Sequence, residues 1–389
     1  MASYATDRYL PGFEPETASG STTSTGVLPH QEIEALIAAR RIRADEPITP
    51  DQVQPASFDV RLGAKCYRIR TSFLPGKTQR VATKLADLTM HELDLSEPTV
   101  LERGCVYLVE AMEEVHLSAD VSARANPKST TGRLDIFTRL ITDHSDRFDR
   151  VERGYRGKLY VEVSPRTFSV RLQAGIRLNQ IRFTRGQPLP ADTHVHALHS
   201  EHTLLYDAKS RPLAPEVLEG GLWLRIDLAG DADGDIVGYR ARRDAPVVDV
   251  TKIRHHPREE YWEPILAGKS RSLVLSPDEF YILVTAERVR VPLSYAAELV
   301  PIEPDVGEFR IHYAGFFDPG FGYGLRGEVK GTPGVLEVRS HEVPFLLEHE
   351  QKVGRLVYER LSRGVERSYG GDVGSSYHAQ RLALAKQFR

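Results

Sequence analysis

The sequence predicts a mainly β protein built from two tandem domains of similar design. Its 389 residues are too many for one ordinary domain and enough for two, each with its own core. Short stretches of alternating apolar and polar residues, separated by Gly, Pro and Asp, recur along most of the chain. One such pattern occurs twice, about 174 residues apart. These observations favour two copies of a β-barrel or sandwich with short peripheral helices.

The first element with a clear period is a short helix over 29–37. Ile33, Leu36 and Ile37 follow Pro29 at helical spacing, and proline suits the start of a helix. After this helix the chain reads mainly as short strands. The clearest alternating stretches are 57–62, 106–109 and 159–163.

An internal repeat divides the chain. The segment 107–117 aligns with 281–291, and 159–163 aligns with 334–338 at nearly the same offset. So long a period exceeds that of solenoid or propeller repeats and indicates a duplicated domain. We expect residues 1–26 to be disordered, copy one to span 27–188 and copy two to span 220–362. A linker rich in Pro and His is expected at 189–219, and a closing tail at 363–389.

Composition excludes several classes of protein. The 51 basic and 54 acidic residues are interleaved and give a net charge of −3, which argues against a general nucleic-acid or membrane surface. Cys66 and Cys105 are the only cysteines, too few for a chain that relies on disulfides. No stretch approaches the roughly 20 apolar residues of a membrane span. A cytoplasmic location fits these features best.

Two short motifs carry the functional signal. The segment 128–133 (KSTTGR) offers a cation and hydroxyls suited to phosphate, and 317–321 (FDPGF) is a tight acidic turn suited to a sugar and base. Either motif alone is commonly an ordinary loop or turn. Together they look like two halves of one nucleotide site.

With the segment 54–63 (QPASFDVRLG) and a glutamate in a V-x-L-E-type strand, these motifs resemble the dCTP deaminases of the trimeric dUTPase superfamily. The resemblance extends from Val27 over nearly the whole chain and is closest to the duplicated, long form. It implies dUTPase-like β-barrel or β-clip domains, a nucleotide as partner, and a homo-oligomer.

The resemblance also implies a site shared between barrels, in which one barrel holds phosphate and its neighbour supplies the acidic turn and a catalytic glutamate. Copy one keeps the phosphate motif but has an expanded 144–155 where the turn belongs. Copy two keeps 314–321 and Glu337, but acids stand at 303 and 305 where phosphate should sit. The simplest hypothesis combines the first motif of copy one with the second of copy two.

The roles implied by the resemblance follow residue by residue. Glu337 would move protons at cytosine C4, Arg133 would stabilise charge, and Ser129 with the backbone carbonyl of Ala314 would orient the water. The remaining residues would bind substrate, as a triphosphate with Mg²⁺ and without zinc: Lys128, Thr130, Asp318, Phe321 and Tyr369. The tail lacks the family's lysine before Tyr369, for which Arg363 or Arg367 could compensate.

Three interpretations stay open beside these roles. Glu162 is the rival catalyst, because copy one retains 154–157 ahead of it. The segment 54–63 could equally be barrel core plus a turn, with Asp59 and Arg61 pairing across strands. The cluster His194–His202 contains half of the zinc deaminase signature, but no P-C-x-x-C accompanies it, so a polar linker is the simpler reading.

The expected reaction is conversion of dCTP to dUTP and ammonia. A dUTPase or a bifunctional deaminase and dUTPase is the alternative within enzymes, and a non-catalytic nucleotide-binding regulator is the alternative outside them. Inhibition by dTTP, the number of sites per chain and the oligomeric state stay open at this stage.

Overall fold

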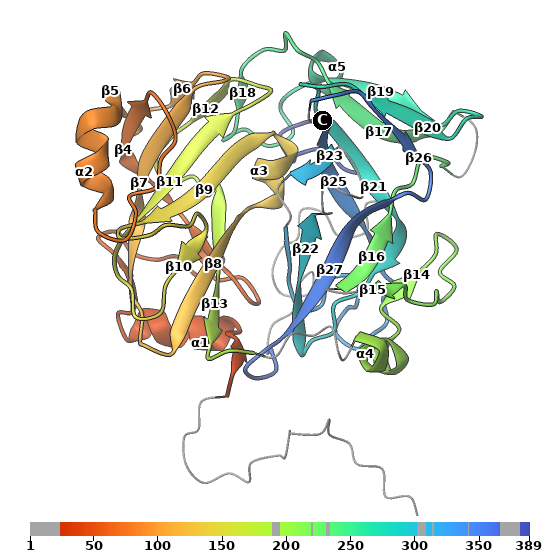
Figure 1. The fold of residues 1–389 in the computed structure, drawn as a ribbon, viewed down its shortest axis with the longest axis horizontal. Helices are drawn as coiled ribbons and strands as arrows, with labels where there is room; N and C mark the ends of the chain where they lie inside the picture. The colour runs from red at the N-terminus through yellow and green to blue at the C-terminus, as the bar shows by residue number, and fades with distance from the viewer. Residues whose placement is uncertain are drawn as a thin grey trace, which may run out of the picture.

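The computed structural model describes residues 24–188, 195–218, 221–230, 234–301, 309–312, 315–340, 342–365 and 382–389. Within them the chain is mainly β, as the sequence predicts, and forms two β units side by side (Figure 1). Most of the predicted disordered segment, 1–23, lies outside the described residues. No helix in these ranges is both long and apolar enough to cross a membrane.

Copy one is built from two larger sheets and most of a small one. The first sheet has the order β1-β13-β8-β10, with β3 also on β13, and the second has the order β5-β4-β7-β11-β9, with β2 also on β7. The third has the order β18-β12-β6. The strands of copy one are β1 (Gly26–Val27), β2 (Ile42–Ala44), β3 (Phe58–Val60), β4 (Leu62–Ile69), β5 (Thr89–Asp94), β6 (Thr99–Leu101), β7 (Val106–His116), β8 (Val121–Pro127), β9 (Ile136–Thr142), β10 (Arg150–Val151), β11 (Arg156–Pro165), β12 (Val170–Leu172) and β13 (Asn179–Arg185).

Copy two repeats this arrangement. Its larger sheets have the orders β19-β17-β21-β25-β23, with β14 on β21, and β15-β16-β27-β22-β24, and a ribbon joins β20 to β26. The strands are β14 (Leu205–Tyr206), β15 (Val217–Leu218), β16 (Gly221–Arg225), β17 (Ile236–Ala241), β18 (Val248–Asp249), β19 (Trp262–Leu266), β20 (Ser272–Leu275), β21 (Tyr281–Val289), β22 (Tyr295–Pro301), β23 (Phe309–His312), β24 (Phe316–Phe317), β25 (Thr332–Ser340), β26 (Phe345–Glu348) and β27 (Lys352–Arg360).

The duplication extends to single side chains. In copy one, Glu113 on β7 accepts hydrogen bonds from the backbone N–H and the Nε of Arg61, at 2.8 and 2.7 Å. In copy two, Glu287 on β21 accepts the same pair of bonds from Arg225, at 2.8 and 2.6 Å. A buried bidentate pair of this kind needs a specific backbone geometry. The predicted internal repeat is therefore confirmed.

Short helices lie at the periphery, as expected, and one corrects a predicted boundary. The predicted helix over 29–37 is confirmed as the first of them, whereas α4 and the strand β14 fall inside the predicted linker. Val195 and Leu198 of α4 are buried in the core of copy two. The helices are α1 (His30–Ala38), η1 (Pro50–Gln52), α2 (Val81–Leu88), α3 (Ser129–Arg133), α4 (Val195–His202) and α5 (Arg258–Tyr261).

The two copies share sheet and core. Strand β18 of copy two pairs in parallel with β12 of copy one. The C-terminal segment 382–389 bonds to 250–258, where Gln387 O accepts from the N–H groups of His255 and His256 at 2.9 and 3.0 Å. Phe388 packs its ring against Phe168 of copy one and Trp262 of copy two, with centroids 6.4 and 5.8 Å away. The copies are thus joined by a common core as well as by the chain.

Candidate active site

The phosphate motif begins where β8 ends and runs through α3, which faces copy two (Figure 1). Its backbone is fixed by the residue before β13, because Leu178 O accepts from the Lys128 N–H and the Thr131 hydroxyl, both at 2.8 Å. Ser129 is exposed at the start of α3, and Thr130 is half-buried. The motif is thus a rigid corner with its hydroxyls near the surface.

The predicted acidic turn follows β24. The N–H of Phe321 donates to Asp318 O at 3.1 Å, and Gly320 has φ of 93°. Proline followed by a glycine with positive φ is typical of a type II turn. The turn is anchored to copy two by the Gly320 N–H, which donates to Val291 O at 2.9 Å. Phe321 packs edge-on against Phe317, with centroids 4.9 Å apart.

Glu337 of copy two lies opposite Arg133 of copy one. Its Oε1 is 3.9 Å from the Arg133 Nε, and the two side chains are each 8 % exposed. Burial raises the pKa of Glu337 to about 8, although Arg133 lowers it, and Asp135 adds to the rise. The structure therefore brings the two predicted half-motifs together within one chain.

Asp318 is held by an arginine that the sequence analysis did not single out. The guanidinium of Arg182, on β13, lies 3.4 Å from Asp318 and donates to Ala297 O and Phe317 O at 2.9 and 3.3 Å. Its Cζ is 4.1 Å from the centre of the Phe316 ring. Burial raises the pKa of Asp318 even though Arg182 opposes the rise. The turn of copy two is thus positioned by a strand of copy one.

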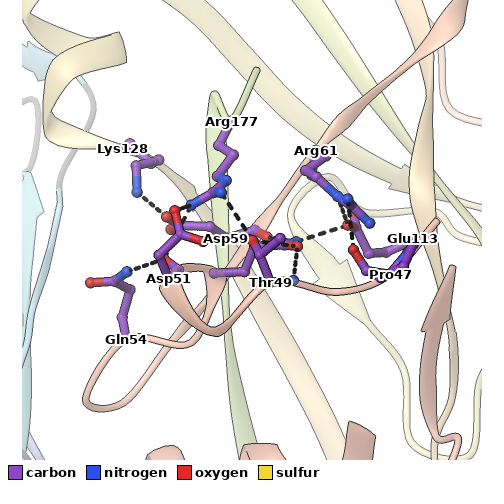
Figure 2. A network of polar contacts seen from close by, with 10 residues as sticks. Pro47, Thr49, Asp51, Gln54, Asp59, Arg61, Glu113, Lys128 and Arg177 are labelled. Atoms are coloured by element: carbon purple, nitrogen blue, oxygen red, sulfur yellow. Dashed lines mark hydrogen bonds and ion pairs between the residues drawn. The ribbon is translucent and has the colours of Figure 1, made fainter. Parts of the chain in front are cut away.

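The segment 54–63 supplies a carboxylate beside the phosphate motif (Figure 2). Lys128 forms an ion pair with the buried Asp59 of β3. Asp59 is also close enough to Asp318 to raise its pKa. Arg61 pairs with Glu113 on β7 instead, so the cross-strand pairing considered for this segment holds for Arg61, whereas Asp59 faces the candidate site.

Glu162 lies elsewhere and has its own partner. Its Oε1 accepts from the Nε and Nη2 of Arg139 at 3.0 and 2.7 Å, and Arg139 is its cross-strand neighbour on β9. The Arg139 Cζ stacks on the Phe148 ring at 3.6 Å. Phe148 belongs to the expanded segment that replaces the acidic turn in copy one. The Glu162 carboxylate is thus ion-paired with an arginine of its own copy.

The structure describes only part of the predicted tail. Ala314, Tyr369 and Arg367 lie outside the described residues. Arg363 donates from Nε to Glu32 on α1 at 3.0 Å. Lys386, in the anchored C-terminal segment, is half-buried, and burial together with the nearby Lys128 lowers its pKa. The cation of the C-terminal segment beside the phosphate motif is therefore Lys386.

The predicted histidine cluster lies partly on α4. His199 Nδ1 accepts from the Leu204 N–H at 3.3 Å, and His202 Nδ1 lies 3.2 Å from the Tyr323 hydroxyl. Burial lowers the pKa of both imidazoles. Across the described ranges, no three His, Cys, Asp or Glu side chains lie close enough together to hold a metal ion.

Comparison with known proteins identifies the family. Residues 24–187 match the 2'-deoxycytidine 5'-triphosphate deaminase N-terminal domain, and residues 191–388 match the C-terminal domain of the same family. The chain belongs to the dCTP deaminase family. The family resemblance expected from the sequence is thereby confirmed, as is its duplicated form.

A crystal structure of 2'-deoxycytidine 5'-triphosphate deaminase from Agrobacterium tumefaciens has a similar fold across both copies. The two are 51 % identical with a TM-score of 0.81, and the match covers 87 % of this chain and 99 % of that one. This likeness supports the expected dUTPase-like architecture of both copies.

Curated relatives match a shorter part of the chain, and their names specify a product. A "dCTP deaminase, dUMP-forming" of Bifidobacterium longum strain DJO10A is 31 % identical over 158 residues, which is 40 % of this chain and 78 % of that protein. A protein of the same name from Bifidobacterium adolescentis is 32 % identical over 144 residues, which is 36 % of this chain and 68 % of that protein. Both names specify dUMP. The expectation for this chain was dUTP, so the names of these relatives differ from it in the product.

Four residues of the site were missed from sequence: Arg182, Asp135, Arg339 and Lys386. Arg182 lies in an ordinary alternating strand, and nothing local marks it as the partner of Asp318. Asp135 directly follows the phosphate motif, so its charge two residues after Arg133 was a signal that could have been used. The same holds for Arg339, two residues after Glu337.

Proposed function

We propose that this chain deaminates dCTP in a site formed by 128–133 of copy one and by Asp318 and Glu337 of copy two. The observation that carries the proposal is the buried Glu337 carboxyl, which faces Arg133 across the junction of the copies at 3.9 Å. A carboxyl with a raised pKa beside a cation suits acid and base catalysis near neutral pH. The chain's membership of a deaminase family gives this geometry its substrate.

Glu337 can perform both proton transfers. Because its pKa is about 8, the carboxyl is mostly protonated at pH 7 and can donate to N3 of the cytosine ring. The resulting carboxylate then accepts a proton from the water whose oxygen attacks C4. The same proton passes to the amino group, which leaves as ammonia when the C4–N bond breaks. The proton of the new C4 hydroxyl returns to Glu337 as the C4 carbonyl forms, which restores the carboxyl. The overall change is dCTP plus water to dUTP plus ammonia.

The remaining residues would position substrate and water. Ser129, exposed at the start of α3, would hold the attacking water, and Arg133 would stabilise the charge that develops on the ring. Lys128 and Thr130 would bind the triphosphate, which arrives as its Mg²⁺ complex because magnesium binds chiefly through phosphate oxygens. Asp318, held by Arg182, would accept a hydrogen bond from the deoxyribose 3'-hydroxyl, and Phe321 would pack on the nucleoside.

We further propose that the product released is dUMP, following the names of the curated relatives. This requires a second hydrolysis, in which water attacks the α-phosphorus and diphosphate leaves. Such a step needs a carboxylate close to the phosphates. Asp59 meets this need, because it is buried and paired with Lys128.

The test follows ammonia, diphosphate and nucleotide together after dCTP and Mg²⁺ are added to the full chain. Equal amounts of ammonia, diphosphate and dUMP support both steps. Ammonia with dUTP alone retains the deaminase and removes the second step. Tight dCTP binding without any ammonia refutes catalysis and favours a nucleotide-binding regulator.

A further inference from the structure

Two ion pairs of opposite polarity cross the junction of the copies beside the candidate site. Arg133 of copy one faces Glu337 of β25, and two residues further along each segment Asp135 faces Arg339. A cation followed by an anion on one segment thus lies against an anion followed by a cation on the other. Only one register of the two segments satisfies both pairs.

The second pair is the more closely bonded. Arg339 Nε lies 3.2 Å from Asp135 Oδ2 and 3.4 Å from Oδ1, and its Nη2 also bonds the carboxylate. Thr167 completes the network, since its Oγ1 donates to Asp135 at 2.6 Å and accepts from Arg339 at 2.8 Å. The Asp135 side chain is fully buried, and that of Arg339 is 10 % exposed.

Backbone bonds connect this network to the phosphate motif. The Asp135 N–H donates to Gly132 O at 2.8 Å, and Asp135 O accepts from the Arg166 N–H at 2.9 Å. Asp135 itself has φ of 52°, a conformation that aspartate adopts more readily than most residues. A displacement of Asp135 would therefore move α3, and Arg133 with it.

The Asp135–Arg339 pair is not repeated by the duplication. In the strand register that makes Glu162 and Glu337 equivalent, Arg339 corresponds to Ser164 in copy one, and Ser164 carries no charge. The Arg61–Glu113 pair, in contrast, has its counterpart in Arg225–Glu287. The network thus accompanies the candidate site and is not part of the common barrel.

We propose that Asp135 and Arg339 form a positioning pair, which holds Arg133 in register with Glu337 and sets the charge around that carboxyl. Buried ion pairs are poor sources of stability but effective in specifying register. The expected effect of the pair on turnover rests on the proposed function. Its expected effect on the pKa of Glu337 concerns the protein without substrate.

Among the residues whose side chains the structure describes, charged groups reach Glu337 from copy one and from its own strand, β25. Arg133 and Asp135 face it from copy one, and Arg339 follows it on β25. Its backbone partners are Ile282 on β21 and His312 on β23. Of these, Asp135 is the anion that raises the pKa of Glu337, so removing its charge should lower that pKa.

The test compares Asp135→Asn, Arg339→Gln and Arg339→Lys with a control, Arg225→Gln, which breaks the ion pair of Arg225 with the buried Glu287 inside copy two. The pKa of Glu337 is measured by ¹³C NMR on protein labelled at the glutamate carboxyl carbon, with Glu337→Gln to assign the signal. Turnover of dCTP and the melting temperature are measured in parallel.

We expect Asp135→Asn to lower the pKa of Glu337 by about one unit, and Asp135→Asn and Arg339→Gln each to lower kcat about 100-fold with little change in KM. Arg339→Lys should restore part of kcat. Arg225→Gln should lower the melting temperature and leave both the pKa and kcat unchanged.

The proposal is overturned if Asp135→Asn and Arg339→Gln only lower the melting temperature, as the control does. If either variant does not fold, Arg339→Lys still decides, because a purely structural pair predicts unchanged kcat in any folded variant. If the wild-type chain releases no ammonia, the proposed function fails, and the NMR titration alone tests the positioning pair.

Discussion

Glu162 and Glu337 occupy equivalent strands of the two copies and differ in what faces them. Glu162 on β11 pairs at 2.7 Å with Arg139, its cross-strand neighbour in the same copy. Glu337 on β25 has His312 at the equivalent backbone position and meets Arg133 of the other copy at 3.9 Å. In copy one this strand carries a glutamate that is ion-paired with an arginine of its own copy. In copy two it carries a glutamate at the junction of the copies.

This contrast shows that equivalent strands of one fold can place a glutamate in two different electrostatic settings. A single arginine at the cross-strand position is enough to occupy the glutamate, because the two side chains lie on the same face of the sheet. The ion pair that fixes the barrel backbone is present in both copies, as Arg61–Glu113 and as Arg225–Glu287, and these two are called the barrel-forming pairs. The two copies therefore share the Arg61–Glu113 and Arg225–Glu287 pairs and differ in the partner of this glutamate.

The largest expected effect separates the two glutamates directly. Glu337→Gln should lower deamination of dCTP by about 10³-fold or more, because it removes the group that moves both protons. Glu162→Gln is the matched control and should retain activity. Ammonia release by both variants is the measurement, and an inactive Glu162→Gln beside an active Glu337→Gln would reverse the assignment.

The barrel-forming pairs should matter for stability alone. Glu113→Gln leaves Arg61 buried without its carboxylate and should cost about 3 kcal/mol of unfolding free energy. Glu287→Gln should cost less, because the Arg225 side chain is 37 % exposed and water can solvate it. Urea unfolding measures both. A loss of kcat in a folded Glu113→Gln would contradict this division of roles.

Copying the arginine of copy one into copy two should impair the site. His312→Arg places a cation at the backbone position paired with Glu337, lowers the pKa of its carboxyl and should reduce kcat about 10-fold to 100-fold at pH 7. The reciprocal Arg139→His should leave kcat unchanged. An unaltered pH profile in His312→Arg would mean that the cross-strand position does not control Glu337.

The pH dependence of stability tests the raised pKa of Glu337 without substrate. The pKa of Glu337 rises from 4.5 to about 8 on folding, so the folded state holds this proton more tightly. Its contribution is full below pH 4.5 and is lost as the pH rises through 8, at no more than about 1.4 kcal/mol per pH unit. Urea unfolding of wild type and Glu337→Gln at pH 5 and 9 tests this. Parallel pH profiles would exclude a raised pKa.

Much of the fold could be predicted from sequence, because alternation and the repeat are local patterns. The helix of α1, the strands β7 and β11 and the duplication were all predicted, and so was the combination of the two half-motifs. The helix α4 was taken for linker because its apolar positions are few and histidines dominate it. Its burial against copy two is a tertiary effect that composition does not reveal.

The polar partners of the site could not be predicted for a similar reason. Arg182 and Asp318 are 136 positions apart, and only the packing of β13 against β24 brings them together. Periodicity identifies which face of a strand is buried, but it does not say which distant charge that face meets.

Strand β18 has a consequence for how this chain can be divided. The family boundary falls between residues 187 and 191, yet the third strand of a sheet in copy one is contributed by Val248–Asp249, and Phe388 packs in the shared core. A gene cut at the boundary would encode a first half with an open sheet edge and a second half with an uncovered aromatic cluster. Each copy therefore depends on the other to cover a sheet edge or an aromatic cluster.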